Sequence, residues 1–490
     1  MLTRLTQLCI LTLATAAAQA QTPSATEVAT AKLGVPPAYT GDLTSLSAVN
    51  IRDAHIELVL DGLNRPWAFE FLDPAEVLIS EIEGRLLRYR FGEPAAVEIT
   101  GLPKIATSQD QTGLLDVAIH PQYAKNRRIY FSYAVVDPAV DGYFLTKVST
   151  AVLAESELTE IQTVIEAGPY GWSPYNFGGA MAFDTDGMLY ISIGDRSEHD
   201  LSQRGDRLQG KILRLHDDGS TPADNPFVDD PEIDDRIYAL GVRNAQGLDF
   251  DSSTGHLYES EHGPLGGDEV NRIVRGGNYG WPTITYGRTY AMEKLGEGTH
   301  AAGMRQPLFY YLPSIATSPL LVYRGSMFPE WDGDILVGAL KGQHISWLDL
   351  DGDQIRSEFP ILGELNSRIR DIKTAADGSI YILTQTGALQ RLHRPPVTDT
   401  PAAAVDPALV YTLVCAGCHD NGAYQAPNPS LASDWDQILK QPLEITYRHT
   451  IEGKGNMPVR GLCEICTDEH LRATVDFLLE RVRSLEQESR

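Results

Sequence analysis

The chain has 490 residues, of which 42% are hydrophobic and 22% are charged, so it can bury a large core and is expected to fold. Its formal net charge of -26 argues against binding to nucleic acids or anionic membranes, because both need clustered Lys and Arg. The length allows roughly three domains of average size, although β-propellers often exceed that average.

The N-terminus has the pattern of an export signal. One Arg precedes a short apolar run that ends in Ala18-Gln19-Ala20. We expect a signal peptide over 1–20, cleaved after Ala20, and an N-terminal extension over 21–54. The run is too short to span a bilayer, no other segment is long and apolar enough, and Cys9 lies too early for a lipid anchor. The mature protein is therefore expected in the periplasm, with no membrane span.

A short motif recurs six times between residues 55 and 394. Most copies pair a turn rich in Asp or Gly with a run of Ile, Val, Leu or Tyr, as in "DTDGMLYISIGDR" and "ADGSIYILTQTGALQRL". Asp-Gly pairs suit tight turns, and the apolar runs suit strands. The pattern predicts an all-β, six-bladed β-propeller, although periodicity alone also allows seven or eight blades.

Several loops carry more polar groups than a turn needs. Gln111 precedes a predicted strand in "SQDQTGLLDVAIHP". The segment "ESEHGPLGGDEVN" offers Asp268, Glu269 and many backbone carbonyls within one Gly-rich loop. Because calcium prefers carboxylate and carbonyl oxygens, this loop is a candidate calcium site.

Basic side chains also gather in these loops. Arg243 and Asn244 lie between glycines in "YALGVRNAQGLDFD", and Lys341 lies in "GALKGQ". Arg368 and Arg370 are two residues apart on a predicted strand, so they share a face. In so acidic a protein, cations that converge from loops suggest an anionic ligand, and guanidinium groups match carboxylates.

Together these motifs resemble the soluble quinoprotein sugar dehydrogenases, which bind pyrroloquinoline quinone (PQQ). The resemblance covers about residues 55–394, and its motifs follow in the family's order: "GLNRPWAFEFL", "QTGLLDVAIHP", "GVRNAQGL", "EHGPLGGDEVN", "GGNYGWP" and "RIRDI". It implies a six-bladed propeller that holds a calcium-chelated tricarboxylate quinone. The implied reaction is oxidation of an aldose sugar or a related alcohol.

The resemblance also implies roles for individual residues. Arg243 and Asn244 match residues at the quinone carbonyls, and Gln111 matches one that lines the substrate pocket. The matching carboxylate-binding cations are Lys341, Arg368 and Arg370. The matching calcium ligands are the carbonyls of Gly263 and Pro264 at the quinone, and Glu269 with the carbonyl of Tyr279 at a second calcium position.

One position departs from the family pattern. Where the family has a catalytic His, "WSPYNFGGAMAF" has Asn176, with Tyr175 in place of an acidic neighbour and Ala180 where Arg is common. We place Asn176 at the catalytic centre with Arg243 and Gln111, yet an amide cannot act as a general base. His199 in "GDRSEHD", a water or a carboxylate would have to replace it, although His199 is more simply a surface residue. Alternatively, the propeller is non-catalytic and binds a sugar or a protein.

A linker and a second domain follow. "HRPPVTDTPAAAVDP" is rich in Pro and Ala, which predicts an extended linker over 395–406. Beyond it, "VCAGCHD" contains Cys415 and Cys418, and a second pair lies at Cys463 and Cys466. Such pairs are typical of zinc sites, redox dithiols or haem attachment. His419 directly after the first pair favours c-type haem, with both thiols bonded to the porphyrin and the imidazole on the iron.

A second iron ligand is predicted from the loop "GKGNMPVRG". Met457 lies there after two glycines that let the loop approach a porphyrin, and a thioether is a common second haem ligand. Residues 407–490 resemble a small class I cytochrome c, with Thr467 as the N-cap of the last helix. "GLCEICTDEHL" resembles a bacterial subgroup with an additional cysteine pair, which implies a disulfide between Cys463 and Cys466.

The sequence thus predicts a six-bladed propeller followed by a small all-α cytochrome c domain. The expected function is an exported, PQQ- and calcium-dependent sugar dehydrogenase that passes electrons to its own haem c. Its partners would be a small sugar or alcohol and a downstream redox protein such as a cytochrome or an oxidase, with no nucleic acid.

Overall fold

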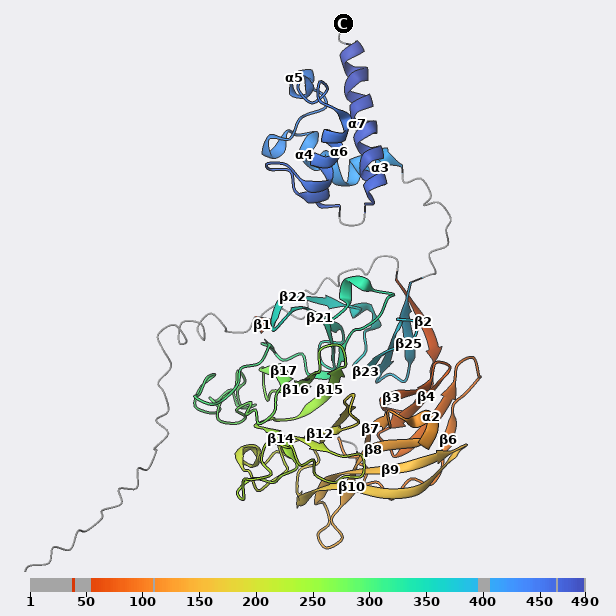
Figure 1. Ribbon diagram of the computed structural model, residues 1–490, viewed down its shortest axis with the longest axis vertical. Coiled ribbons are helices and arrows are strands. Elements are labelled where there is room, and N and C mark those ends of the chain that lie inside the picture. The colour runs from red at the N-terminus through yellow and green to blue at the C-terminus, as the bar shows by residue number, and fades with distance from the viewer. Residues whose placement is uncertain (1–37, 40–53, 109–110, 395–405, 464–465, 489–490) are drawn as a thin grey trace, which may run out of the picture. The chain divides into compact units, whose positions relative to one another are not determined.

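The computed structural model describes residues 38–39, 54–108, 111–394, 406–463 and 466–488. The predicted signal peptide, nearly all of the predicted N-terminal extension and nearly all of the predicted linker lie outside these residues. The chain divides into two compact units, Met1–Arg394 and Pro395–Arg490 (Figure 1).

Six antiparallel sheets, here called blades 1 to 6, form the first unit, which confirms the predicted six-bladed propeller. Blades 1 to 3 comprise β3 (Pro66–Asp73), β4 (Glu76–Glu81), β5 (Arg85–Arg90), β6 (Val97–Ile99); β7 (Leu114–Ile119), β8 (Arg128–Val136), β9 (Phe144–Ala154), β10 (Glu157–Gly171); and β11 (Gly178–Phe183), β12 (Leu189–Ile193), β13 (Lys211–Leu215), β14 (Ile237–Leu240). Blades 4 to 6 comprise β15 (Ala245–Asp251), β16 (His256–Glu261), β17 (Asp268–Ile273), β18 (Phe309–Tyr311); β19 (Thr317–Val322), β20 (Ile335–Ala339), β21 (Ile345–Asp351), β22 (Gln354–Ile361); and β23 (Ile369–Thr374), β24 (Ile380–Thr384), β25 (Leu389–His393), β2 (His55–Leu60).

The ring closes because β2, from the start of the unit, pairs antiparallel with β25 from its end. An additional strand that was not predicted, β1 (Ala38–Tyr39), runs parallel to β18 at the edge of blade 4. Four short helices lie between the strands: α2 (Tyr123–Asn126), η1 (His199–Gln203), η2 (Pro329–Trp331) and η3 (Gly363–Leu365).

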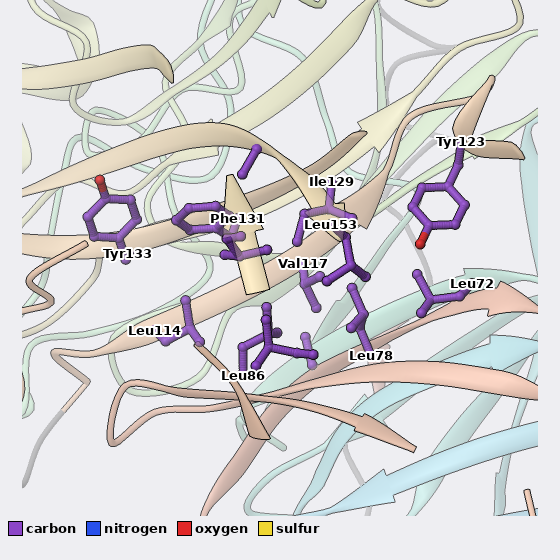
Figure 2. Close-up of a cluster of buried hydrophobic side chains, with 14 residues drawn as sticks. Leu72, Leu78, Leu86, Leu114, Val117, Tyr123, Ile129, Phe131, Tyr133 and Leu153 are labelled. Carbon is purple, nitrogen blue, oxygen red and sulfur yellow. The ribbon is translucent and has the colours of Figure 1, made fainter. Parts of the chain in front are cut away.

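Hydrophobic side chains fill the space between neighbouring blades. Figure 2 shows the cluster between blades 1 and 2, where Leu78 and Leu86 pack with Val117 and Phe131. Comparable clusters join the other neighbouring pairs, including blade 6 with blade 1. The second strand of a blade is therefore covered on both faces, as in the fully buried β4, β12, β20 and β24. This explains why the recurring motif is a continuous apolar run, and why each blade contains one copy.

A buried serine in the second strand of blades 1 to 4 ties each blade to the next. These serines donate from Oγ to carbonyls of the next innermost strand: Ser80 to Leu115 at 2.6 Å, Ser132 to Gly179 at 2.7 Å, Ser192 to Ala245 at 3.0 Å and Ser260 to Ser318 at 3.0 Å. The bonds satisfy hydroxyl groups that have lost water, and they fix innermost strands that follow loops of the site.

Charged side chains line a cavity on the propeller axis that is bounded by all six innermost strands. Three aspartates of β7, β15 and β23 accept hydrogen bonds from backbone N–H groups of the next blade: Asp116 from Met181 at 2.7 Å, Asp249 from Val322 at 2.8 Å and Asp371 from Phe69 at 2.8 Å. Burial raises the pKa of Asp116 and of Asp249 to about 6, and that of Asp371 to about 7.

Lys373 supplies positive charge to these carboxyl groups. It forms an ion pair with Glu70 at 3.3 Å, and its charge opposes the effect of burial on all three aspartates. Burial itself would lower the pKa of Lys373, but Glu70 and Asp371 raise it, so the amine stays protonated. Lys373 is therefore a buried cation among four acidic groups on the propeller axis.

We expect Lys373→Met to lower the free energy of unfolding of the propeller by about 2 kcal/mol at pH 8, because buried carboxylates lose their cation. The pKa values of these aspartates are higher in the folded than in the unfolded chain, so the free energy of unfolding falls as pH rises. The difference in stability between Lys373→Met and the wild type should therefore shrink toward pH 5, where the aspartates are protonated. Unfolding in guanidinium chloride, followed by tryptophan fluorescence at each pH, measures the free energy of unfolding. Lys125→Met, at an exposed position, is the control; equal stability of both variants at pH 8 would contradict the account.

The second unit is helical, as predicted for a small cytochrome c. Its helices are α3 (Pro407–Val410), η4 (Tyr411–Cys415), α4 (Ala416–His419), η5 (Ala423–Gln425), α5 (Ala432–Trp435), α6 (Leu443–Glu452), η6 (Val459–Leu462) and α7 (Asp468–Glu488). The Thr467 hydroxyl accepts from the His470 N–H at 3.2 Å, which confirms Thr467 as the N-cap of α7. One face of α7, with Val475 and Leu479, packs on Tyr411 near the start of the domain.

Two cysteines of this unit are bonded to each other. Cys463 and Cys466 form a disulfide beside the N-terminus of α7, whereas Cys415 and Cys418 are free thiols. The disulfide uses two of the four thiols that a four-thiolate zinc site would need, which argues against that alternative. No helix in the described part of the chain is long and apolar enough to cross a membrane.

Candidate functional site

The predicted site residues of the propeller gather at one mouth of the ring. In an antiparallel blade, the start of the first strand and the end of the second strand lie at the same edge. Gln111, Asn176, Arg243 and Arg368 precede the first strands of four blades. Loops that follow second strands contribute His199, Gly263, Pro264 and Lys341, together with Gln385, which was not predicted.

Arg243 is buried and bonds to the Gly-rich loop of blade 4. Its guanidinium donates to the carbonyls of His262 at 2.8 Å and Gly263 at 3.1 Å, and lies 5.3 Å from the centre of the Trp281 ring. Its Nε is buried with no hydrogen-bond partner. Glu261 accepts from the backbone N–H groups of Arg243 and Asn244, which fixes the turn that carries them.

Asn244 and Gln111 contact the loop that leads into blade 3. Asn244 Oδ1 accepts from the Gly178 N–H at 3.1 Å, which leaves Asn244 Nδ2 buried with no hydrogen-bond partner. Gln111 Oε1 accepts from the Asn176 N–H at 2.9 Å. The structure thus brings Gln111 to Asn176, and the loops of Asn176 and Asn244 to each other, as the predicted catalytic centre requires.

Arg368 and Arg370 lie together, as their spacing predicted. Their guanidinium groups donate to the same Gln385 Oε1, at 2.8 Å from Arg368 and 2.8 Å from Arg370 Nη2. Arg370 also stacks on Trp67, 4.3 Å from the ring centre. Burial and then the charge of Arg368 lower the pKa of Arg370 to about 9. Two like charges are therefore held side by side by a neutral acceptor.

His262 lies between this pair and Arg243. Burial, followed by the positive charges of Arg243, Arg370 and Arg368, lowers the pKa of His262 to about 3, so the imidazole is neutral. Its Nε2 is buried with no hydrogen-bond partner. Among the residues that the structure describes, no carboxylate lies within ion-pair distance of Arg243, Arg368 or Arg370. The mouth therefore holds excess positive charge and several unpaired buried polar atoms.

Lys341 stands apart from these cations. It is exposed in the loop after β20, and its backbone N–H donates to the Ile315 carbonyl at 2.9 Å. The structure places Lys341 at the same mouth but gives it no contact with Arg368 or Arg370.

Three of the four predicted calcium ligands, all except Pro264, line one small cavity. Gly263, Glu269 and Tyr279 line it together with Arg243 and Trp281. Burial, followed by the nearby Glu261, raises the pKa of Glu269 well above its usual value, which is the expected state of a carboxyl with no cation beside it. No group of three or more His, Cys, Asp or Glu that could hold a metal occurs among the described residues.

Asn176 belongs to a buried network centred on Asp195. Asn176, itself buried and with a φ of 56°, donates from Nδ2 to Asp195 Oδ1 at 2.8 Å. Asp195 Oδ2 accepts from His199 Nδ1 at 2.6 Å and from Trp281 Nε1 at 2.9 Å. Burial opposes ionisation, but the His199 hydrogen bond and the charge of Arg243 lower the pKa of Asp195, so its carboxylate is ionised.

The cytochrome unit places three of the four predicted haem residues next to one another. Cys415, Cys418 and His419 lie within one helical stretch, and His419 Nδ1 donates to the Pro427 carbonyl at 2.9 Å, which leaves Nε2 for a metal. Met457 lies in a turn closed by two backbone hydrogen bonds with Lys454, each of 3.0 Å. Exposed apolar side chains on the neighbouring segments suit a porphyrin: Leu413, Tyr424, Val459 and Leu462.

Some residues of the site were not predicted from the sequence. Asp195, Trp281 and Gln385 were not singled out, and His199 was considered more simply a surface residue. Asp195 and His199 are four residues apart in "GDRSEHD", a spacing that could have paired them. Trp281 lies in "GGNYGWP", but its bond to Asp195 spans 86 positions and depends on the closed ring.

Profile comparison agrees with this architecture. The family described as "Glucose / Sorbosone dehydrogenase" matches residues 63–392, and "Cytochrome C oxidase, cbb3-type, subunit III" matches residues 402–478. The chain therefore belongs to the Glucose / Sorbosone dehydrogenase family and carries a C-terminal cytochrome c domain.

Two of the similar proteins are named as sugar dehydrogenases. Aldose sugar dehydrogenase YliI of Escherichia coli (strain K12) is 36% identical over 347 residues, which cover 70% of this chain and 93% of that protein. Quinoprotein glucose dehydrogenase B of Acinetobacter calcoaceticus is 27% identical over 70% of this chain and 88% of its own length.

Solved structures extend the comparison. The apo-form of the soluble aldose sugar dehydrogenase from Escherichia coli superposes with a TM-score of 0.67 at 36% identity, over 70% of this chain and all of the other (100%). A PQQ-bound aldose sugar dehydrogenase from Streptomyces coelicolor gives a TM-score of 0.59 at 25% identity, over 69% and 98% of the two chains.

Proposed function

We propose that this chain is an exported, PQQ-dependent aldose dehydrogenase that passes electrons from the propeller to a haem c in its own C-terminal domain. The observation that carries the proposal is the cluster of Arg243, Arg368 and Arg370 around neutral His262, without a carboxylate partner in the described part of the chain. The PQQ-bound relative and the sugar dehydrogenases at 27% to 36% identity support the same ligand and substrate class.

The chemistry of the cluster fits a tricarboxylate quinone. Repulsion and burial make it unfavourable to hold charged Arg368 and Arg370 side by side. An anion that bonds to both guanidinium groups would offset that free-energy cost. Lys341 can reach an anion only from solvent, so we assign it a weaker contribution. The unpaired Arg243 Nε and Asn244 Nδ2 supply donors for neutral oxygens such as quinone carbonyls.

Calcium would complete the site. We assign its quinone-side position to the carbonyls of Gly263 and Pro264, and a second position to Glu269 with the carbonyl of Tyr279. The neighbouring Glu269 and Glu261 favour a cation here, because burial raises the pKa of both carboxyl groups and a bound cation would offset the cost of ionising them.

The roles of the chain's own residues follow from this arrangement. When bound, PQQ supplies a two-electron oxidant that accepts hydride. Arg243 is positioned to stabilise negative charge that develops on an oxygen during the oxidation. Gln111 holds the Asn176 backbone and borders the place of the sugar. In the C-terminal domain, Cys415 and Cys418 would bond the porphyrin while His419 and Met457 ligate the iron.

Joining both domains in one chain favours transfer within the molecule. A linker of about the proposed length, 395–406, keeps donor and acceptor at a high effective concentration. Signal-peptide cleavage after Ala20 would place the protein in the periplasm, where c-type haem is attached and a downstream cytochrome or oxidase can accept the electrons.

We expect the double variant Arg368→Ala/Arg370→Ala to bind PQQ at least 100-fold more weakly, because two charge-assisted contacts to carboxylates of about 1.5–3 kcal/mol each are lost. Titration of PQQ into the calcium-loaded protein, followed by calorimetry, measures the Kd. Arg356→Ala, which removes an exposed arginine paired with Asp351, is the control and should bind PQQ like the wild type. A wild-type protein that takes up no PQQ in millimolar calcium would refute the proposal.

Asn176 favours one alternative, a non-catalytic propeller that binds a sugar or a protein beside an electron-transfer domain. Its side chain cannot take a proton, although it keeps its hydrogen bond to Asp195. Sugar oxidation by the PQQ-loaded protein separates the two functions. Binding of PQQ without reduction by any aldose would favour the alternative.

A further inference from the structure

The network around Asp195 contains an imidazole where the proposed oxidation needs a base. Asn176 bonds to Oδ1 of Asp195, and His199 bonds to Oδ2 of the same carboxylate at 2.6 Å. Asp195 is fully buried, and the Ser197 N–H and the Trp281 indole complete its four donors. The carboxylate is therefore saturated and fixed, and it dictates which nitrogen of His199 carries the proton.

His199 and Arg243, the group that would stabilise the developing charge, both contact Trp281. The His199 ring packs edge-on against the indole of Trp281, with 5.0 Å between centres, and the Arg243 guanidinium lies 5.3 Å from the same indole. The side chain of His199 is 40% exposed. Since Nδ1 donates to Asp195, the Nε2 lone pair is available, and no partner for it occurs among the described residues.

The short helix that carries His199 is fixed from two sides. Lys211 is fully buried and donates to the carbonyls of Leu201 at 2.8 Å and Ser202 at 3.0 Å, both in η1. Gln203, the last residue of η1, donates to the Trp281 carbonyl at 2.8 Å. These contacts fix the backbone of η1, from which His199 bonds to Asp195.

We propose that His199 is the catalytic base of the oxidation, in the role that Asn176 cannot fill, and that Asp195 is its positioning residue. The inference rests on the proposed function. His199 Nε2 takes the proton of the anomeric hydroxyl of an aldose, and the C–H bond of that carbon breaks with both electrons leaving as hydride to the quinone oxidant. The second bond between that carbon and its oxygen forms, so the sugar leaves as a lactone. Asp195 holds the imidazolium that results, as a carboxylate does in a hydrolase triad.

The first test compares His199→Gln with the wild type, both loaded with PQQ and calcium. We expect glucose to reduce the bound quinone about 100- to 1,000-fold more slowly in the variant, because general-base catalysis typically contributes 10²- to 10⁴-fold. The Kd for PQQ should stay within two-fold. His256→Gln, at the start of β16, is the matched control and should react like the wild type.

The outcomes separate the two proposals. A His199→Gln variant that reacts within two-fold of the wild type overturns the role of His199 and leaves the proposed function standing. A wild-type protein that binds PQQ but is reduced by no aldose overturns both.

A second arm restores a base at the other position. Adding Asn176→His to the His199→Gln variant should recover the rate to within about tenfold of the wild type, because both residues bond to the same carboxylate. A double variant that stays as slow as His199→Gln would assign the loss to disturbed packing on Trp281 and overturn the proposal.

A third readout needs no turnover. In the cofactor-free full chain labelled with ¹⁵N-histidine, nuclear magnetic resonance should show neutral His199 protonated at Nδ1, with its signals identified by their loss in His199→Gln. Asp195→Asn should remove this preference, and it should slow the loaded enzyme without changing the Kd for PQQ. A wild-type His199 protonated at Nε2 when neutral would overturn the proposal, because no lone pair would then be available.

Discussion

An Arg243→Ala variant loaded with PQQ and calcium is expected to oxidise glucose about 100- to 1,000-fold more slowly than the wild type, the loss typical of one oxyanion donor. Arg243 is the cation that bonds to the Gly263 carbonyl, stacks on Trp281 and influences the ionisation of Asp195. Its loss removes a positive charge that lies against the same indole as the proposed base. The measurement is kcat at saturating glucose with an artificial electron acceptor, which makes the result independent of the haem.

Arg204→Ala provides the matched control, because Arg204 pairs with Asp206 at an exposed position. This variant should retain the wild-type kcat. The PQQ Kd of both variants must be measured first, so that each is saturated. A loss of less than tenfold in saturated Arg243→Ala would show that Arg243 only shapes the loop.

The second large effect concerns the haem. In Cys415→Ala/Cys418→Ala, we expect complete loss of covalently attached haem, because these free thiols are the only proposed bonds to the porphyrin. Haem staining after denaturing electrophoresis measures the covalently attached haem. Sugar oxidation with an artificial acceptor should persist, since the propeller has its own core and closes its own ring.

The other cysteine pair serves as the control. Cys463→Ala/Cys466→Ala removes the disulfide but should keep covalent haem. Loss of haem stain from both double variants would contradict separate roles for the two pairs.

Local patterns predicted the architecture well. The recurring turn-and-strand motif marks the second strand of each blade, whose two buried faces require a continuous apolar run. The two-residue spacing of Arg368 and Arg370 predicted their shared face, and both bond to Gln385. The serines that link blades 1 to 4 lie in "VLIS", "YFS", "YIS" and "YES". This repeat was a further sequence signal for four of the six blades.

Tertiary contacts account for what the sequence did not predict. Whether His199 is a solvated side chain or part of the site depends on Trp281, which is separated by more than eighty positions and meets it only in the closed ring. Lys211 was not singled out from the sequence, yet it is fully buried and its amine bonds to two carbonyls of η1.

Reduction of the haem by sugar within one chain tests the central claim most directly. The full-length protein, loaded with PQQ and calcium under anaerobic conditions, is mixed with glucose while the haem absorbance is followed. The account predicts haem reduction at a rate that does not change with protein concentration. Haem that stays oxidised while the quinone is reduced, or that is reduced at a rate proportional to protein concentration, would contradict it.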